Sequence, residues 1–354
     1  MRLFSNSFLT AFFLYFEKVM PLKSLYVRLS LISSIRIFLH KKYSNNTYMA
    51  KNIIARFYSS SRWCKLMILL TLIIIFFIMY KKTPILREGF IQREKFILKK
   101  GANVYDRFYA SLYDELLFDK VKNEYEVGEI IQNTHPTQQS LILDIGSGTG
   151  DHVALFSSKK LHAIGIDASP AMVMAAQKKY PNETFEEGDV TNIRLFPAHT
   201  FTHITCFYFT LYYIQDKARF FKNCYEWLQP GGYLSIHLAD RNMFDPILNV
   251  ANPLAFISPQ KYAKKRITTS MVKFNGFDYK SEYILNKAKN KAVFEETFKD
   301  PQGKARKNEH IMYMPTQQHI IQLAKDTGFI LEGKIDLIPV EYEYQYIYVF
   351  YKPT

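Results

Sequence analysis

The sequence predicts an α/β fold with a mostly parallel sheet, because short apolar strands alternate with helical stretches between residues 141 and 240. Strands are expected near residues 141, 162, 183, 203 and 233. A glycine-rich turn follows the first of them directly. Right-handed crossovers then place this turn at the switch point of a sheet that has helices on both faces.

The function prediction starts from residues 141–150, LILDIGSGTG. Apolar residues lead into Asp144, and three alternating glycines then precede a helical pattern that begins at Asp151. Glycines at this spacing let the backbone turn sharply and approach a ligand closely. The helix N-terminus adds free N–H groups and a partial positive charge. We therefore expect a nucleotide-like ligand at this turn.

Later motifs distinguish between the cofactors that such a turn can bind. Asp167 ends the second strand, 21 residues after Gly146, where a carboxylate can accept both ribose hydroxyls. Asp151 stands where the dinucleotide fingerprint GxGxxG has its third glycine. The third strand ends in EEGDV at residues 186–190, and LQPGG at residues 228–232 precedes the fifth strand.

In this order the motifs resemble the class I S-adenosylmethionine (SAM)-dependent methyltransferases, in their small-molecule type 11/25 branch, over residues 105–240. The resemblance implies a Rossmann-like seven-stranded sheet with SAM as cofactor. It implies that Asp144 orients the methionine amino group, that Asp167 holds the ribose and that Asp189 accepts from the adenine. The cofactor-binding residues that it implies are Tyr105, Tyr113, Asp144, Gly146, Ser147, Gly148, Gly150, Asp167, Ala168, Ser169, Asp189, Val190 and Phe207.

Two aromatic positions in that set have particular implied roles. Phe207, at the end of the fourth strand, would border the reactive sulfonium. Tyr105 and Tyr113 lie in VYDRFYASLYDEL, which resembles the helix that closes over the cofactor in this family. Ordinary packing of an amphipathic helix is the competing interpretation of both tyrosines.

Methyl transfer depends mainly on holding the acceptor at attack distance and excluding water, so no catalytic residue is obligatory. If the acceptor must lose a proton, His237 near the end of the fifth strand is the first candidate, with Asp240 and Tyr212 as alternatives. A packed histidine is the competing interpretation of His237. The nine histidines show no metal-binding spacing, so no metal is predicted.

The charge of this 354-residue chain is unevenly distributed. Residues 1–100 contain 18 Lys and Arg against 3 Asp and Glu, whereas the remainder contains 28 against 29. The expected methyltransferase domain, residues 103–354, therefore has almost no net charge. Because nucleic-acid binders usually present a basic surface, a nucleic-acid partner is disfavoured.

The N-terminal third is expected to anchor the protein in a membrane. Residues 65–82 contain 15 consecutive residues with one polar interruption, LMILLTLIIIFFIMY, and lysines at both ends. Residues 1–62 form a basic, acid-poor arm that resembles a mitochondrial transit segment, and residues 83–102 form a basic, partly helical linker. The predicted location is a single-pass membrane protein, in the mitochondrial inner membrane or in another intracellular membrane.

After the fifth strand, residues 241–315 are expected to form an antiparallel insertion that caps the substrate pocket. Residues 257–310 contain 13 Lys and Arg against 6 Asp and Glu, which could steer an anionic substrate. A solvated hairpin is the alternative. Residues 316–327 predict the last helix, and residues 329–338 and 344–351 predict the hairpin that completes seven strands.

The predicted function is that of a membrane-anchored SAM-dependent methyltransferase whose acceptor is a small molecule, a lipid-like compound or a membrane protein. Phe207-Tyr208-Phe209 replaces the Asn/Asp-Pro-Pro-Tyr box of adenine- and glutamine-directed enzymes, which disfavours those acceptors. A membrane-tethered scaffold that has kept the fold and lost the chemistry is the main alternative. An NAD-dependent oxidoreductase is disfavoured by Asp151 and by the segments EEGDV and LQPGG. The oligomeric state stays open.

Overall fold

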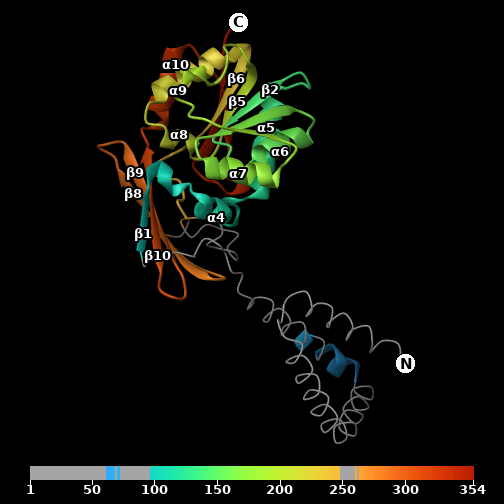
Figure 1. Cartoon of the computed structure of the whole chain (residues 1–354), viewed down its shortest axis with the longest axis vertical. Coiled ribbons are helices and arrows are strands. Elements are labelled where there is room, and N and C mark those ends of the chain that lie inside the picture. The colour runs from blue at the N-terminus through green and yellow to red at the C-terminus, as the bar shows by residue number, and fades with distance from the viewer. Residues whose placement is uncertain (1–60, 68–69, 72–95, 248–259, 261–262) are drawn as a thin grey trace, which may run out of the picture. The chain divides into compact units, whose positions relative to one another are not determined.

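The computed structural model describes residues 61–67, 70–71, 96–247, 260 and 263–354 (Figure 1). The chain divides into two compact units, residues 1–83 and residues 84–354. In the first unit, the described residues 62–67 are helical, and Trp63 and Leu66 on this helix are exposed. All the other elements described below belong to the second unit.

The structure contradicts the predicted single-pass membrane location. Within the described ranges, none of the helices has both the length and the apolar character that crossing a membrane requires. The predicted apolar run has 15 residues, fewer than the roughly 20 that usually span a bilayer. Most of the predicted span, residues 68–69 and 72–82, lies outside the described residues, and so do residues 1–60 of the predicted arm.

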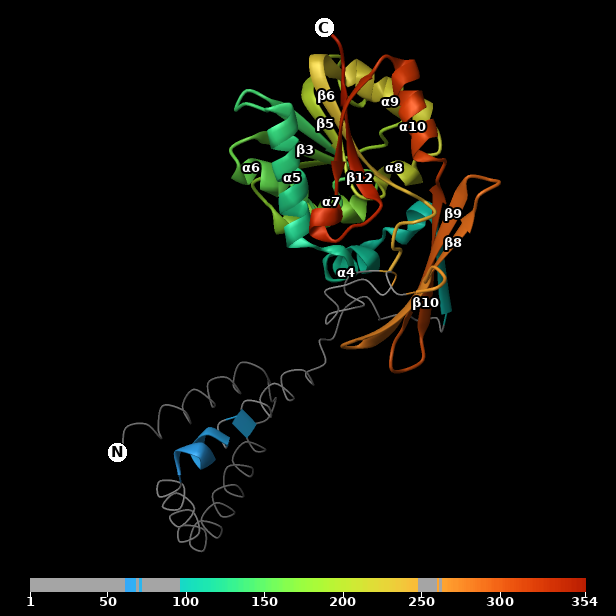
Figure 2. The same ribbon diagram turned by 180° about the vertical axis from the view of Figure 1, so that it is seen from behind.

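A seven-stranded sheet forms the centre of the second unit, in the order β11-β12-β6-β5-β2-β3-β4 (Figure 2). From β6 to β4 all neighbours pair in parallel, whereas β12 is antiparallel to both β6 and β11. This arrangement confirms the predicted Rossmann-like α/β fold. The strands are β2 (Leu141–Ile145), β3 (His162–Asp167), β4 (Thr184–Glu187), β5 (Phe201–Cys206), β6 (Leu228–Ala239), β11 (Ile330–Asp336) and β12 (Gln345–Tyr351).

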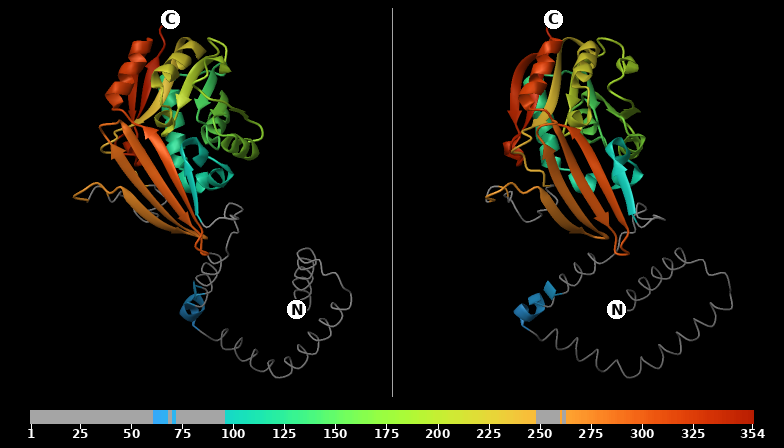
Figure 3. Two further views of the ribbon diagram at one scale, coloured as in Figure 1. Left: turned by 60° about the vertical axis from the view of Figure 1, so that its left-hand side comes forward. Right: turned by 90° about the vertical axis from the view of Figure 1, so that its left-hand side faces the viewer.

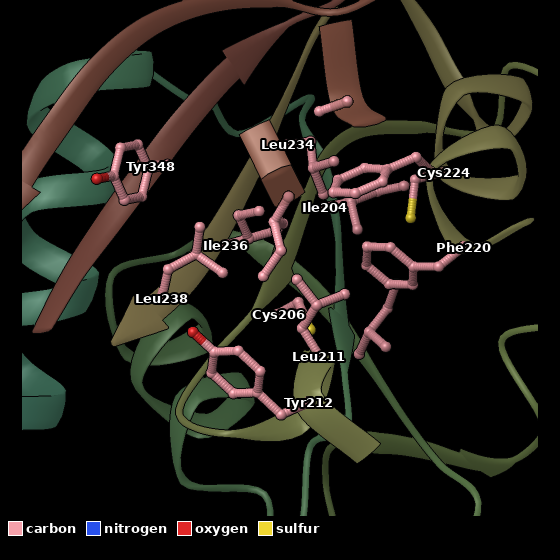
Figure 4. Packing of buried hydrophobic residues seen from close by; sticks show 14 of the residues in the cluster. Ile204, Cys206, Leu211, Tyr212, Phe220, Cys224, Leu234, Ile236, Leu238 and Tyr348 are labelled. Carbon is pink, nitrogen blue, oxygen red and sulfur yellow. The ribbon is translucent and has the colours of Figure 1, made fainter. Parts of the chain in front are cut away.

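Helices cover both faces of this sheet, which explains why β2 at its centre is almost entirely buried. The neighbouring residues Ile142 and Leu143 of β2 point to opposite faces and belong to different hydrophobic clusters. One cluster packs against α5, α6 and α7, and the other, shown in Figure 4, packs against α9 and α10. These helices and the short α8 are α5 (Lys120–Thr134), α6 (Asp151–Ser158), α7 (Pro170–Lys179), α8 (Thr210–Tyr213), α9 (Lys217–Trp227) and α10 (Gln317–Thr327).

Several helices begin where the sequence provides a side chain that caps the free N–H groups. Asp119 accepts from the Lys122 N–H at the start of α5, and Ser169 accepts from the Met172 N–H at the start of α7. Thr316 caps α10 in the same way, and Gly328 ends that helix with a φ of 115°.

The second sheet has five strands in the order β1-β10-β9-β8-β7 (Figure 3). Its pairs are antiparallel except β1 with β10, which is parallel. Residues 83–95 of the predicted partly helical linker lie outside the described residues. Within the linker, β1 pairs with residues 305–309, a contact that no local pattern reveals. The strands are β1 (Phe96–Lys100), β7 (Thr269–Phe274), β8 (Phe277–Asn286), β9 (Lys291–Lys299) and β10 (Ala305–Tyr313). Three short 3-10 helices in the described residues are η2 (Gly101–Val104), η3 (Ile193–Leu195) and η6 (Ile338–Val340).

Helix α4 (Arg107–Leu117) connects the two sheets. The buried Arg306 of β10 donates to both carboxylate oxygens of Asp106, at 3.0 and 2.9 Å, and to the Val104 carbonyl at 3.0 Å. Phe108 of α4 packs edge-on against Phe298 of β9, with ring centroids 5.4 Å apart. Because Asp106 is also the N-cap of α4, the same carboxylate starts the helix and fixes it to the second sheet.

Arg306→Met is expected to lower the free energy of unfolding by about 2 to 3 kcal/mol, because the Val104 carbonyl and the Asp106 carboxylate lose charge-assisted hydrogen bonds. Urea unfolding of the full chain at pH 7 measures this. The matched control is Lys307→Met on the same strand, which breaks the more exposed ion pair with Glu295 and is expected to cost less than about 1 kcal/mol. Equal losses in the two variants would contradict the role of Arg306.

Candidate active site

A cavity of about 920 Å³ opens between the glycine turn of the main sheet and the inner face of the second sheet. Its lining includes Gly146, Asp167 and Asp189 from the main sheet. It also includes Phe294 of β9 and His310 of β10. This volume lies near the upper end of the range for small-molecule sites, so the cavity is large enough for more than one ligand group.

The glycine turn exposes its backbone to the cavity. Gly146 has a φ of +69°, and a Cβ added there would lie 2.3 Å from the Thr210 side chain. Its N–H donates to the Ile166 carbonyl at 2.7 Å. Gly148 has a φ of +56° and lines the cavity next to Tyr113. The positive φ and the close approach of Thr210 together require glycine at position 146.

The Asp167 carboxylate is held by backbone N–H groups of two segments, the glycine turn and the residues that follow β3. It accepts from the Gly148 N–H at 3.0 Å and from the Ser169 N–H at 2.8 Å. Burial raises the pKa of Asp167, while these two hydrogen bonds oppose the shift. The Ser169 hydroxyl donates to the Tyr105 carbonyl at 2.6 Å, which connects the segment before α4 to the end of β3. A preoriented carboxylate of this kind can accept from a ribose diol.

The third strand end contributes a second carboxylate to the cavity. Asp189 follows β4 and accepts from both the N–H and the hydroxyl of Thr191, at 2.9 and 2.8 Å. Val190 lines the cavity beside it. Nine of the implied cofactor residues meet in this one cavity: Tyr105, Tyr113, Gly146, Gly148, Asp167, Ala168, Ser169, Asp189 and Val190.

Three further residues of the implied set line a smaller neighbouring pocket of about 60 Å³, namely Asp144, Ser147 and Phe207. Asp144 accepts from the Thr205 hydroxyl at 2.8 Å, and burial raises its pKa to about 6. Phe207 stacks on His152 with ring centroids 4.2 Å apart, rather than facing the large cavity. Gly150 lines neither of these two pockets; it caps α6 with a φ of +89°.

The three predicted base candidates do not line the large cavity. His237 is fully buried; it bonds through Nδ1 to the Tyr208 carbonyl and lies 3.1 Å through Nε2 from Gln345 Oε1. Burial, with the charge of Lys122, lowers the pKa of His237 to about 4. Tyr212 is buried and exchanges hydrogen bonds with the Ala239 backbone, and Asp240 caps the turn after β6. This placement favours the packing interpretation of His237.

Sequence reasoning missed the aromatic residues that make up much of the cavity wall. Tyr208, with a φ of +50°, Phe209 and Tyr213 follow β5, and Tyr109 comes from α4. The run FYFTLYYI at residues 207–214 was the available signal, since aromatic residues are unusually dense at the carboxyl end of a parallel strand. His310 gave no local signal, because its side of β10 is set only by packing against α4.

The charged side chains that line the cavity are mostly acidic. Its lining carries five carboxylates, and Lys120 is the only lysine or arginine among the described residues that line it. None of the lysines and arginines described between 263 and 310 lines it, so the predicted steering of an anionic substrate by the insertion is not supported. No group of three or more potential metal ligands occurs in the described ranges. The acidic side chains that line the cavity are Asp119, Asp167, Asp189, Asp245 and Glu341.

A glycine turn at the switch point, with carboxylates at the ends of the two adjacent strands, defines a nucleoside-binding site of the class I methyltransferase type. The residues fit SAM: Gly146 leaves room beside the backbone, Asp167 can take the ribose, and the acidic, aromatic wall suits a sulfonium cation.

Comparisons with known proteins agree with this class. Residues 142–232 match the family model described as a methyltransferase domain. The chain is 31% identical over 138 residues to a dTDP-4-amino-2,3,4,6-tetradeoxy-D-glucose N,N-dimethyltransferase of Saccharopolyspora spinosa, covering 37% of this chain and 54% of the relative. It is 34% identical over 103 residues to the erythromycin 3''-O-methyltransferase of Saccharopolyspora erythraea, covering 27% and 33%. The chain thus spans about half or less of these curated relatives.

A solved structure supports the fold over a longer range. A SAM-dependent methyltransferase from Clostridium acetobutylicum superimposes with a TM-score of 0.53 at 17% identity, covering 70% of this chain and 98% of that one. At this identity the likeness concerns the fold. Together with the family match, it identifies residues 142–232 as part of a SAM-dependent methyltransferase domain, and SAM is the cofactor of this class.

Gly146→Ala is expected to weaken SAM binding at least about 10-fold, because the new Cβ meets Thr210 and a positive φ costs an L-residue about 1 to 2 kcal/mol. Titration calorimetry of the full chain measures this. Gly276→Ala is the matched control: Gly276 has a φ of +104° in the β7–β8 turn with no atom within 4 Å of the added Cβ. It should lower the melting temperature and leave SAM affinity unchanged. Unchanged affinity in Gly146→Ala would contradict the placement of the cofactor.

His237 is expected to titrate near pH 4, below the ordinary histidine value of about 6.5, because its burial disfavours the charged imidazolium. NMR of the imidazole nitrogens between pH 3 and pH 8, with His237→Gln to assign the signal, measures this. A titration near pH 6.5 would mean that solvent or a cavity reaches the ring.

Proposed function

We propose that the protein is a SAM-dependent N-methyltransferase that acts on a small molecule bearing an amine. The observation that carries this proposal is the lining of the cavity, which combines eight tyrosines and four phenylalanines with five carboxylates and one lysine. SAM would supply an electrophilic methyl group. The chain's residues would bind the two substrates, orient them and exclude water.

The residues proposed to hold SAM lie on the main-sheet side of the cavity. Gly146 and Gly148 would leave space for the methionine part, with Asp144 as the acceptor for its amino group. Asp167 would bind the ribose and Asp189 the adenine amino group. Burial raises the pKa of Asp144, so a bound ammonium group would stabilise its charged form.

The proposal of an amine acceptor rests on charge. An ammonium group interacts favourably with carboxylates and with the faces of aromatic rings. Asp167 and Asp189 are assigned to SAM. An acceptor that carries a phosphate or carboxylate beside the reacting atom would therefore meet the remaining carboxylates, Asp119, Asp245 and Glu341, and a single lysine, Lys120. The Saccharopolyspora spinosa relative, named for an amino sugar, supports nitrogen as the methylated atom. The erythromycin 3''-O-methyltransferase supports oxygen instead. The acidic lining of the cavity favours nitrogen over oxygen as the methylated atom.

The test incubates the purified full chain with SAM and matched acceptor probes, and mass spectrometry detects the added methyl group. D-glucosamine, ethanolamine and tyramine are the amine probes. D-glucose is the hydroxyl counterpart of glucosamine, and glucosamine 6-phosphate is its anionic counterpart. We expect methylation of at least one amine on nitrogen, and slower methylation of the hydroxyl and phosphate counterparts.

Two results would contradict the proposal. One is faster methylation of glucose or glucosamine 6-phosphate than of every amine. The other is tight SAM binding with no methylated amine, which would favour the scaffold that keeps the fold without the chemistry. NAD is added in place of SAM as the control for the cofactor, and no binding of NAD is expected.

A further inference from the structure

His310 connects the cavity to a buried carboxylate. It lies on β10, lines the cavity and is only 2% exposed. Its Nδ1 is 3.1 Å from the Tyr213 hydroxyl, and its Nε2 is 2.6 Å from Glu296 Oε2. Tyr213 belongs to α8 after the fourth parallel strand, whereas Glu296 belongs to β9. The two sheets thus contribute to one hydrogen-bonded chain of three side chains.

Glu296 is well suited to remain an anion. It is 1% exposed and also accepts from the hydroxyls of Tyr279 at 2.8 Å and Tyr109 at 3.2 Å. Asn308 Nδ2 donates to it as well, at 3.3 Å, so with His310 four donors surround the carboxylate and favour its anionic form, although burial opposes it. An anionic Glu296 cannot donate, and therefore Nε2 of His310 carries the proton in their hydrogen bond.

This assignment fixes the direction of the remaining bonds. In a neutral imidazole with a proton on Nε2, Nδ1 is an acceptor, so the Tyr213 hydroxyl donates to it. Tyr105 lies edge-on to Tyr213, with ring centroids 5.7 Å apart, and both tyrosines are half-buried in the cavity wall. A proton accepted at the Tyr213 oxygen can therefore pass to His310 without an intervening rotation of any side chain.

His310 also has the right chemistry for a proton acceptor, because a neutral imidazole keeps one ring nitrogen with a free lone pair. It is the only histidine among the described residues that line the cavity. The ionisable groups that face it are Tyr105 from the segment before α4, Tyr109 from α4, Tyr213 from α8 and Glu296 from β9.

We propose that Tyr213, His310 and Glu296 form the proton relay that deprotonates the acceptor amine. The inference rests on the proposed function. The N–H bond of the ammonium breaks as its proton moves to the Tyr213 oxygen, and the O–H bond of Tyr213 breaks as its proton moves to His310 Nδ1. The resulting imidazolium is paired with the Glu296 carboxylate. The amine keeps its electron pair and can then bond to the methyl carbon of SAM, whose C–S electrons return to sulfur.

The first test reads the relay without any acceptor. NMR of the imidazole nitrogens in the full chain at pH 8, with His310→Asn to assign the signal, should show a proton on Nε2 and none on Nδ1. Tyr213→Phe should shift the Nδ1 signal by removing its donor. A neutral ring with its proton on Nδ1, or an Nδ1 signal that Tyr213→Phe leaves unchanged, would overturn the relay even if no acceptor were known.

The second test uses whichever amine probe the wild type methylates. His310→Asn is expected to lower kcat at pH 7 by at least about 100-fold, the range that general bases contribute. SAM affinity by calorimetry should stay unchanged. Because alkaline buffer supplies neutral amine without a base, the deficit should shrink about tenfold per pH unit between pH 7 and pH 9. A merely structural role would give a loss that does not depend on pH.

The matched control is His203→Asn, which replaces another buried histidine, on β5, that lies outside the cavity. It should keep both the turnover and the pH profile of the wild type. A wild-type pH profile in His310→Asn would overturn the relay and leave the proposed function intact. A wild type that methylates no amine would instead reject the proposed function, while the NMR measurement would still decide on the hydrogen-bonded chain.

Discussion

The shape of the cavity depends on the chain segment before α4, because this segment is held between the two sheets. Arg306 of β10 binds Asp106 and the Val104 carbonyl from one side. Ser169, at the end of β3, binds the Tyr105 carbonyl from the other. These contacts set the distance between the glycine turn and the second sheet. A buried guanidinium suits this position because its planar group can bond to a carboxylate and a carbonyl at once.

The insertion and the cavity that it borders differ in the sign of their charge. The insertion between β6 and α10 is basic in composition, yet its lysines and arginines do not line the cavity in the described residues. The acids and aromatic rings come mostly from the strand ends and from α4. The basic composition of the insertion therefore does not describe the cavity, whose charged lining is mostly acidic. The net charge of a segment therefore does not predict the charge of the few side chains that line a pocket.

The sequence predicted the parts of the site that depend on local pattern. The glycine turn and Asp167 follow from the alternation of strands and helices, because the carboxyl ends of parallel strands meet at one edge, and Asp189 follows from the resemblance to methyltransferases. His237 was predicted as a base from its place near a strand end, but its ring packs against the Tyr208 carbonyl. His310 could not be predicted, since it reaches the cavity only after β10 pairs with β9 and packs against α4. Nor could β1, whose partner lies about 200 residues away.

The pairing of β1 with β10 has a consequence for where the domain can be cut. Phe96 to Lys100 pair with Ala305 to Glu309, the residues directly before His310. A chain shortened to residue 103, the predicted start of the methyltransferase domain, would lose β1 and turn β10 into an exposed edge. Unpaired edge strands attract other strands and favour aggregation. The working boundary of the folded unit therefore lies before residue 96, outside the segment that its sequence motifs delimit.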